Sequence, residues 1–144
     1  MKRALRVPVI GNGDIASGQD ARRRIEESGV DGVMIARAAM GNPWVLREVV
    51  AVLRGEPAPR AADIPEKIGL ILAHLDLNIA HHGERRGVLA MRAHFGEYFT
   101  GFPGARELRT RLNDIATRED VVALLKPFLG RKRPVDDGPV RTPA

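Results

Sequence analysis

Two short segments near the start of the chain combine glycine, polar side chains and a cation in a way that suits anion binding. The first is Gly11-Asn12-Gly13-Asp14, which follows the apolar run Val7–Ile10. The second is Ala36-Arg37, which follows the apolar run 31–35. Glycine lets the backbone approach an anion with its N–H groups directed at it, and an arginine guanidinium binds phosphate oxygens in pairs. Together the segments predict a phosphate site.

Each segment has a simpler interpretation when it is taken alone. A Gly-Asn-Gly sequence after a strand is often only a tight turn, and an isolated arginine such as Arg37 is more often part of a surface ion pair. The occurrence of both segments in consecutive units favours anion binding. Spacing alone does not name the ligand.

Two β-α units must position these segments. The runs 7–10 and 31–35 are short and apolar, which is typical of strands buried on both faces of a parallel sheet. Ser17 or Asp20 can begin the helix after the first strand, and Pro43-Trp44 opens the helix after the second. In (β/α)8 barrels the phosphate site commonly uses the loops after strands 7 and 8, so the pattern matches the last quarter of such a barrel. Two strands leave both sheet edges open, and we expect the remaining strands to lie upstream or on another chain.

The chain changes character after a proline-containing linker at residues 55–60, and only helices are expected from Asp63 onward. Asp63 and Glu66 predict a capping box, and Thr117 is expected to cap the last helix. Apolar residues recur at helical spacing along four segments. These are Ile64, Ile68, Leu72, Leu75 and Ile79; Val88, Met91, Phe95 and Phe99; Leu108, Leu112 and Ile115; and Val121, Leu124, Leu125 and Phe128. Residues 130–144 show no periodicity and are expected to form a disordered tail.

Composition limits the classes of function. The chain has no cysteine, which excludes disulfides, thiolate catalysis and zinc–thiolate sites. Its 23 Lys and Arg against 18 Asp and Glu give a net charge of +5, which permits a polyanionic partner without requiring one. No apolar run is long enough to span a membrane, and a cytoplasmic location is expected. No metal site is expected, because His74 and His81 are two helical turns apart, about 10 Å.

Two longer strings resemble one known family. VPVIGNGDI and GVDGVMIARAAMGNPWVLREV resemble the tRNA-dihydrouridine synthase family, which usually shows a proline-containing strand, G-N-G-D-I, D-G-V-M-I-G-R and G-N-P-W. The later string RAHFGEYFTGFPGARELRTRL resembles the helical-domain motif of the same family. The resemblance covers residues 6–129. It implies a C-terminal fragment, with the last two β/α units of an FMN-binding (β/α)8 TIM barrel at residues 1–55 and a helical bundle, the tRNA-binding domain, at residues 61–129.

The resemblance also implies an activity. The family reduces uridine to dihydrouridine in tRNA, using FMN that NADPH reduces, with a flipped-out uridine as hydride acceptor and a cysteine as acid. The chain is therefore expected to belong to an FMN-dependent oxidoreductase with tRNA as its partner. Because it has no cysteine, no catalytic residue is assigned to it. A truncated chain, a missed start or one piece of a split protein is expected.

The FMN-phosphate residues implied by the resemblance lie in the two glycine and arginine segments. Asn12, Gly13 and Asp14 match the first phosphate loop of the family. Ala36 and Arg37 match the second loop, where the family usually has Gly-Arg. The methyl group of Ala36 is a small departure that can crowd the phosphate or alter the angle of the loop.

The RNA-binding residues implied by the resemblance lie among the helices. Arg92 and His94 match a basic motif that usually reads Arg-Lys-His, and Arg109 matches an arginine after the Phe-Pro-Gly turn. Ala93 stands in the lysine position and Glu97 in a usual tryptophan position, and both changes weaken the expected phosphate contact. From composition alone a solvated helix face explains this stretch better, whereas the resemblance favours RNA binding.

Three functions remain open at this point. They are a truncated flavin oxidoreductase acting on tRNA, a non-catalytic RNA-binding or interaction fragment, and another FMN or sugar-phosphate barrel. The missing cysteine favours the second for this chain alone, and the helical-domain motif argues against the third. The first fifty residues are expected to be unstable in isolation and to bind little or no flavin. The target uridine and the oligomeric state are not predicted.

Overall fold

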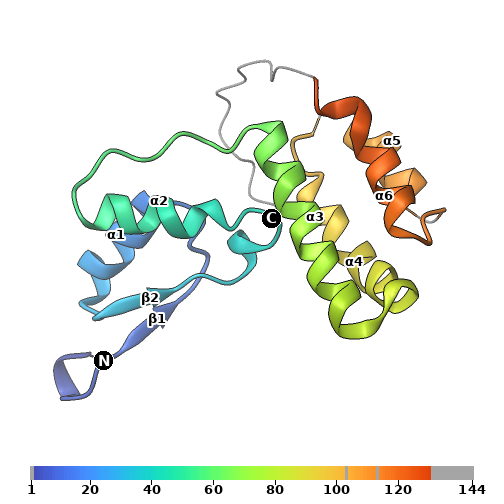
Figure 1. Cartoon of the computed structure of the whole chain (residues 1–144). Helices are drawn as coiled ribbons and strands as arrows, with labels where there is room; N and C mark the ends of the chain where they lie inside the picture. The colour runs from blue at the N-terminus through green and yellow to red at the C-terminus, as the bar shows by residue number, and fades with distance from the viewer. Residues whose placement is uncertain (1, 103, 113, 131–144) are drawn as a thin grey trace. The chain divides into compact units, whose positions relative to one another are not determined.

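Residues on either side of the Ala61–Ala62 junction belong to two separate structural units. A computed structural model describes residues 2–102, 104–112 and 114–130. The first unit is mixed α/β with a small parallel sheet, and the second has helices and turns but no strand among its described residues (Figure 1). The tail expected at residues 130–144 lies outside the described residues, apart from Gly130.

The first unit alternates strands with helices, as the sequence predicts. After the short 3-10 helix η1 (Lys2–Ala4), its elements are β1 (Ile10–Asn12), α1 (Gly18–Ser28), β2 (Gly32–Met34), the 3-10 helix η2 (Arg37–Ala39) and α2 (Trp44–Leu53). The two strands are parallel, with Ile10 opposite Gly32 and Asn12 opposite Met34. Both strands therefore end at the same edge of the sheet.

The position and burial of the first strand differ from the prediction. The strand begins at Ile10 and includes two residues of the expected glycine loop, because its pairing with residues 32–34 sets the register. Val7 and Ile10 are 62% and 60% exposed, so the expectation that this run is buried on both faces is wrong. In the described ranges the sheet consists of β1 and β2, and the small core of this unit forms on the side of α1 and α2. That core contains Ile15, Ala21, Val45 and Val49, with Val33, Ile35 and Ala39 packed against it.

The second unit consists of helices joined by short turns. They are α3 (Ile64–His82), α4 (Glu84–Tyr98), α5 (Ala105–Arg111), α6 (Arg118–Leu125) and the 3-10 helix η3 (Lys126–Phe128). Both predicted helix starts are confirmed. The Asp63 carboxylate accepts the Glu66 N–H at 2.9 Å within a capping box, and Thr117 forms a second capping box with Asp120. The local signals in the sequence therefore locate these helices correctly.

A continuous hydrophobic core holds the second unit together. Nearly all of the predicted apolar positions are buried, and Leu72 and Ile79 pack against them as partly buried residues. Phe95 and Phe99 are fully buried with their rings stacked, 5.9 Å between centroids. α3 and α4 cross closely, because a Cβ atom at Gly87 would lie only 2.7 Å from the Cα of Ile79.

Candidate functional site

The structure brings the two predicted phosphate segments together at one edge of the sheet. Asn12 ends β1 opposite Met34, which ends β2, so Gly13-Asp14 and Ala36-Arg37 leave the sheet side by side. All five predicted residues are exposed. The carboxyl edge of parallel strands is where ligands bind in α/β folds. The geometry is therefore compatible with one shared anion site.

An ion pair joins the two loops. The Arg37 guanidinium donates a hydrogen bond from Nη2 to Oδ1 of Asp14. Arg37 is thus the surface ion pair that the simpler interpretation expected, and its partner lies in the other loop. The Arg37 side chain is 84% exposed, so its remaining N–H donors are open to solvent.

The backbone conformation of the first loop explains two of its residue types. Asp14 has a φ of 36°, the only positive φ of a non-glycine residue within the described ranges. Aspartate is one of the few side chains that tolerate this region. Gly13 has a φ of 150°, and a Cβ atom there would meet nothing within 4 Å. Glycine therefore allows the positive φ at this position. The space beside the main chain there is open.

A short 3-10 turn shapes the second loop. Ala36 precedes η2, and its carbonyl accepts the Ala39 N–H at 3.0 Å. Arg37 is the first residue of η2, and its carbonyl accepts the Met40 N–H at 3.0 Å. This short 3-10 turn fixes the backbone from which the Arg37 side chain extends.

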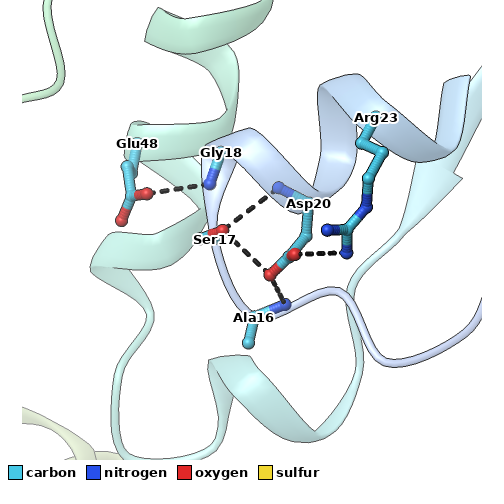
Figure 2. Close-up of polar contacts among 6 residues, drawn as sticks. All are labelled: Ala16, Ser17, Gly18, Asp20, Arg23 and Glu48. Carbon is cyan, nitrogen blue, oxygen red and sulfur yellow. Dashed lines mark hydrogen bonds and ion pairs between the residues drawn. The ribbon is translucent and has the colours of Figure 1, made fainter. Parts of the chain in front are cut away.

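The N-terminus of α1 is capped from within the loop that precedes it (Figure 2). The Ser17 hydroxyl accepts the Asp20 N–H at 3.1 Å and donates to the Asp20 carboxylate at 2.8 Å. The same carboxylate accepts the Ala16 N–H at 3.3 Å and pairs with Arg23 at 2.8 Å. The hydrogen bond from Ser17, with smaller effects of Ala16 and Arg23, lowers the pKa of Asp20. The carboxylate is therefore held in its ionised form at the positive end of the helix.

A second carboxylate reaches the same helix end from α2. Glu48 accepts the Gly18 N–H at 2.8 Å (Figure 2). The close approach of the two helices requires a glycine, because a Cβ atom at Gly18 would lie 2.5 Å from Cγ2 of Val52. Two carboxylates at this N-terminus disfavour an additional anion there. The helix end is therefore a less favourable position for a phosphate than the loops at 12–14 and 36–37.

Two of the predicted RNA-binding residues hold the helical unit together. Arg92 of α4 is partly buried, and its Nη2 donates to the carbonyl of Ile115 at 2.6 Å. Arg109 of α5 donates to the carbonyl of Gly96 at 3.1 Å and to the Thr100 hydroxyl at 3.2 Å. Both guanidinium groups therefore link α4, or the turn after it, to the segments that follow.

The third predicted residue, His94, lies on another side of α4. It is two positions after Arg92 in the chain, which corresponds to about 200° around a helix. His94 is exposed, and its ring centroid lies 4.9 Å from that of His74 on α3. The structure therefore does not bring Arg92 and His94 to a common face.

The His94 contact belongs to a cluster that sequence reasoning missed. Nδ1 of His74 lies 3.1 Å from the Tyr98 hydroxyl. Burial lowers the pKa of His74, with a further contribution from His94, and burial raises the pKa of Tyr98. A signal was available, because His74 and His94 lie at similar distances on either side of the turn at Gly83.

The part of the chain that the structure describes has neither a metal-binding cluster nor a membrane-spanning helix. No group of three or more histidine, aspartate or glutamate residues is arranged there to hold a metal ion. None of the helices in these residues combines the length and the apolar character needed to cross a membrane.

Comparison with known proteins gives one consistent match. Residues 1–132 match the family model described as Dihydrouridine synthase (Dus). The tRNA-dihydrouridine synthase B of Pseudomonas aeruginosa is 40% identical over 134 residues, which cover 92% of this chain and 40% of that protein. The probable tRNA-dihydrouridine synthase of Mycobacterium leprae is 38% identical over 119 residues, 83% of this chain and 31% of that protein. That of Rickettsia bellii is 34% identical over 137 residues, 92% of this chain and 42% of that protein.

Proposed function

This chain belongs to the dihydrouridine synthase family, and from that premise we propose that it binds the phosphate of FMN and contacts tRNA in the synthesis of dihydrouridine. The chain spans 40% of the Pseudomonas relative and 31% of the Mycobacterium relative. The complete reaction is therefore proposed for the family's full catalytic unit, and binding is proposed for the residues of this chain. A cytoplasmic location accords with a tRNA substrate.

The observation that best supports the phosphate site is the ion pair between Asp14 and Arg37. It holds a guanidinium at the carboxyl ends of two adjacent parallel strands, beside the exposed backbone of Gly13. Guanidinium and backbone N–H groups are suitable donors to phosphate oxygens, so this set of residues fits the phosphate end of a flavin nucleotide. A carboxylate beside a phosphate would repel it. We therefore assign Asp14 to the positioning of Arg37, and Asn12, Gly13, Ala36 and Arg37 to phosphate contact.

The arrangement of the first unit supports a barrel fold. β1, α1, β2 and α2 would form the last two β/α units of a (β/α)8 TIM barrel, and the exposed apolar side chains of Val7, Ile10 and Met34 would be covered by the neighbouring strands and the barrel interior. When bound and reduced by NADPH, FMN supplies the hydride for uridine reduction. The residues described here would orient the cofactor through its phosphate.

A second candidate function is favoured by one observation. The chain has no cysteine, and the family's acid step needs one. A non-catalytic role in RNA binding accounts for the same helices without that step. The two candidates differ in a measurable way, since only the first requires the protein for dihydrouridine formation.

The function is tested in cells by deleting the gene and measuring dihydrouridine in tRNA nucleosides by mass spectrometry. We expect dihydrouridine to be lost from at least one tRNA position and to return when the gene is restored. Unchanged dihydrouridine at every position, with tRNA binding intact, would establish the non-catalytic candidate instead.

The phosphate site is tested by NMR titration of the purified chain with inorganic phosphate. We expect the amide signals of Gly13 and Ala36 to shift, and the Arg37→Ala variant to bind about tenfold more weakly, the equivalent of about 1.4 kcal/mol. Arg54→Ala is the matched control, because Arg54 is an exposed arginine of the same unit outside both loops. Equal phosphate affinities of the two variants would show that Arg37 does not contribute to phosphate binding.

A further inference from the structure

The turn between α3 and α4 carries exposed histidine and arginine side chains that neither predicted site includes. His81 and His82 end α3, and Arg85 and Arg86 lie in the first turn of α4. All four are exposed. The two histidine rings meet edge to face, with 4.5 Å between their centroids. Residues 81–86 are named the α3–α4 basic turn.

Close packing of the two helices fixes the shape of this turn. Gly83 reverses the chain with a φ of 76°, and its N–H donates to the Ile79 carbonyl at 2.8 Å. Directly behind the turn, the absence of a side chain at Gly87 lets α4 contact the backbone of Ile79. Both helix ends are thereby held together, so the α3–α4 basic turn is displayed on a rigid support.

The carboxylates of Glu84 and Asp76, near the turn, accept hydrogen bonds from Arg118 and not from Arg85 or Arg86. The Glu84 carboxylate accepts the backbone N–H of Arg118 at 3.1 Å, and the Asp76 carboxylate accepts from the Arg118 guanidinium at 2.6 and 3.1 Å. Glu119 also acts on Arg118 through its charge. Within the described ranges of the chain, neither Arg85 nor Arg86 forms an ion pair. Their charges are therefore available to a ligand.

This availability distinguishes the turn from the arginines that the motif predicts. Arg92 and Arg109 already donate to main-chain carbonyls, so a phosphate would have to compete with bonds that hold the fold. Arg85 and Arg86 make no such contact with other described residues, so binding displaces only solvent from their guanidinium groups.

We infer that the α3–α4 basic turn docks on the phosphate backbone of RNA, with Arg85 and Arg86 as the principal contacts. The inference rests on the proposed function, which makes tRNA the partner, and it assigns the contact to residues outside the family motif. An acidic protein would also satisfy the charges. The phosphates of RNA form a closely spaced line of negative charge, which the two adjacent guanidinium groups can contact together. We therefore commit to RNA as the partner, and the test below separates it from an acidic protein.

The test is the binding of labelled tRNA to the full chain at several salt concentrations. We expect the Arg85→Ala/Arg86→Ala double variant to bind about tenfold more weakly, and the slope of log affinity against log salt to fall by about 1 to 2. The matched control is Arg106→Ala/Arg111→Ala, which removes two exposed arginines of α5 in the same unit and changes the net charge equally. The control is expected to change affinity by less than about threefold.

Different outcomes overturn different claims. If the wild-type chain fails to bind tRNA at low salt, the proposed RNA-binding function fails and this inference fails with it. If the wild type binds and the two double variants behave alike, only the inference is overturned. If the Arg85/Arg86 variant keeps tRNA affinity but loses binding to polyglutamate, the surface serves an acidic protein.

A second measurement uses the wild-type chain alone and therefore does not depend on whether the double variant folds. Phenylglyoxal modifies accessible arginines, and mass spectrometry of the wild-type chain locates the modified positions. We expect tRNA to protect Arg85 and Arg86 while Arg106 and Arg111 remain reactive. Equal reactivity of Arg85 and Arg86 with and without bound tRNA would overturn the inference.

Discussion

The two units of the chain differ in how completely they bury their apolar side chains. In the second unit, Phe95, Phe99 and Leu75 are fully buried within one continuous core. In the first, Val7 and Ile10 are 62% and 60% exposed. Helices that pack as a hairpin can bury their apolar stripes against each other, whereas a two-stranded parallel sheet leaves both edges and much of its surface uncovered. Stability is therefore expected to reside in the helical unit, and the exposed loops of the first unit are where ligand chemistry is proposed.

The comparison also separates two uses of arginine. In the first unit Arg37 extends from a loop, 84% exposed, and bridges to a second loop. In the second unit Arg92 and Arg109 donate to main-chain carbonyls. The same residue type therefore stays exposed, and open to the proposed phosphate contact, in the first unit, and it links segments of the fold in the second.

The largest expected effect comes from the core of the second unit. Phe95→Ala should lower the free energy of unfolding of that unit by about 3 to 5 kcal/mol, because it leaves a cavity beside the stacked ring of Phe99. Urea denaturation followed by far-UV circular dichroism measures it. Leu77→Ala is the control on α3, where the side chain is 70% exposed, and it should change stability by about 0.5 kcal/mol or less. Similar losses in the two variants would contradict a closed core.

The next effect tests the close crossing of α3 and α4. Gly87→Ala should cost about 1 to 3 kcal/mol of unfolding free energy, because the new methyl group would overlap the backbone of Ile79. Gly69→Ala in α3 should instead add up to about 1 kcal/mol, because nothing lies within 4 Å of its added Cβ and alanine favours the helix. The same denaturation assay applies. Opposite signs are the diagnostic result, and a gain in both variants would mean that the helices lie further apart.

A smaller effect is expected from pH. Burial and His94 lower the pKa of His74 in the folded state, so the unfolded chain binds this proton more tightly. The free energy of unfolding of the second unit should therefore fall as pH drops below about 6.5. Urea midpoints measured between pH 7.5 and 5.5 check the direction, and His74→Gln should flatten the dependence. His82→Gln, at an exposed position, serves as the control. If it flattens the pH dependence of stability as much as His74→Gln does, His74 is not the cause of that dependence.

The smallest effect concerns the uncovered strand. Ile10→Thr should change the stability of the chain by about 0.5 kcal/mol or less, because the side chain is already 60% exposed. Denaturation and sedimentation velocity are measured together. A large loss, accompanied by a shift from dimer to monomer, would show that a second copy covers the sheet in solution.

The sequence located those elements whose determinants are local. The capping residues Asp63 and Thr117 and the helical spacing of apolar residues predicted the second unit, because caps and periodicity act within a few residues. The β-α-β-α order and the shared edge for the two loops were also predicted. The start of β1 was not, because pairing with β2 decides which residues form the strand.

The details of the candidate sites depend on contacts that sequence spacing does not encode. The hydrogen bonds of Arg92 and Arg109 involve carbonyls 23 and 13 residues away. The pairing of Asp14 with Arg37 likewise spans 23 residues. The divergence of Arg92 and His94 follows from the sequence alone, since residues two positions apart on any helix are separated by about 200°.

The carboxylates of Asp20 and Glu48 at the start of α1 have a consequence for ion selectivity. They offset the positive field of the helix end, so at the proposed phosphate site we expect attraction toward small anions to come mainly from the planar fork of Arg37. A fork with parallel donors favours oxyanions that present two oxygens at once, whereas a spherical halide engages it less well. Chloride at physiological concentration should therefore compete only weakly with phosphate at these loops.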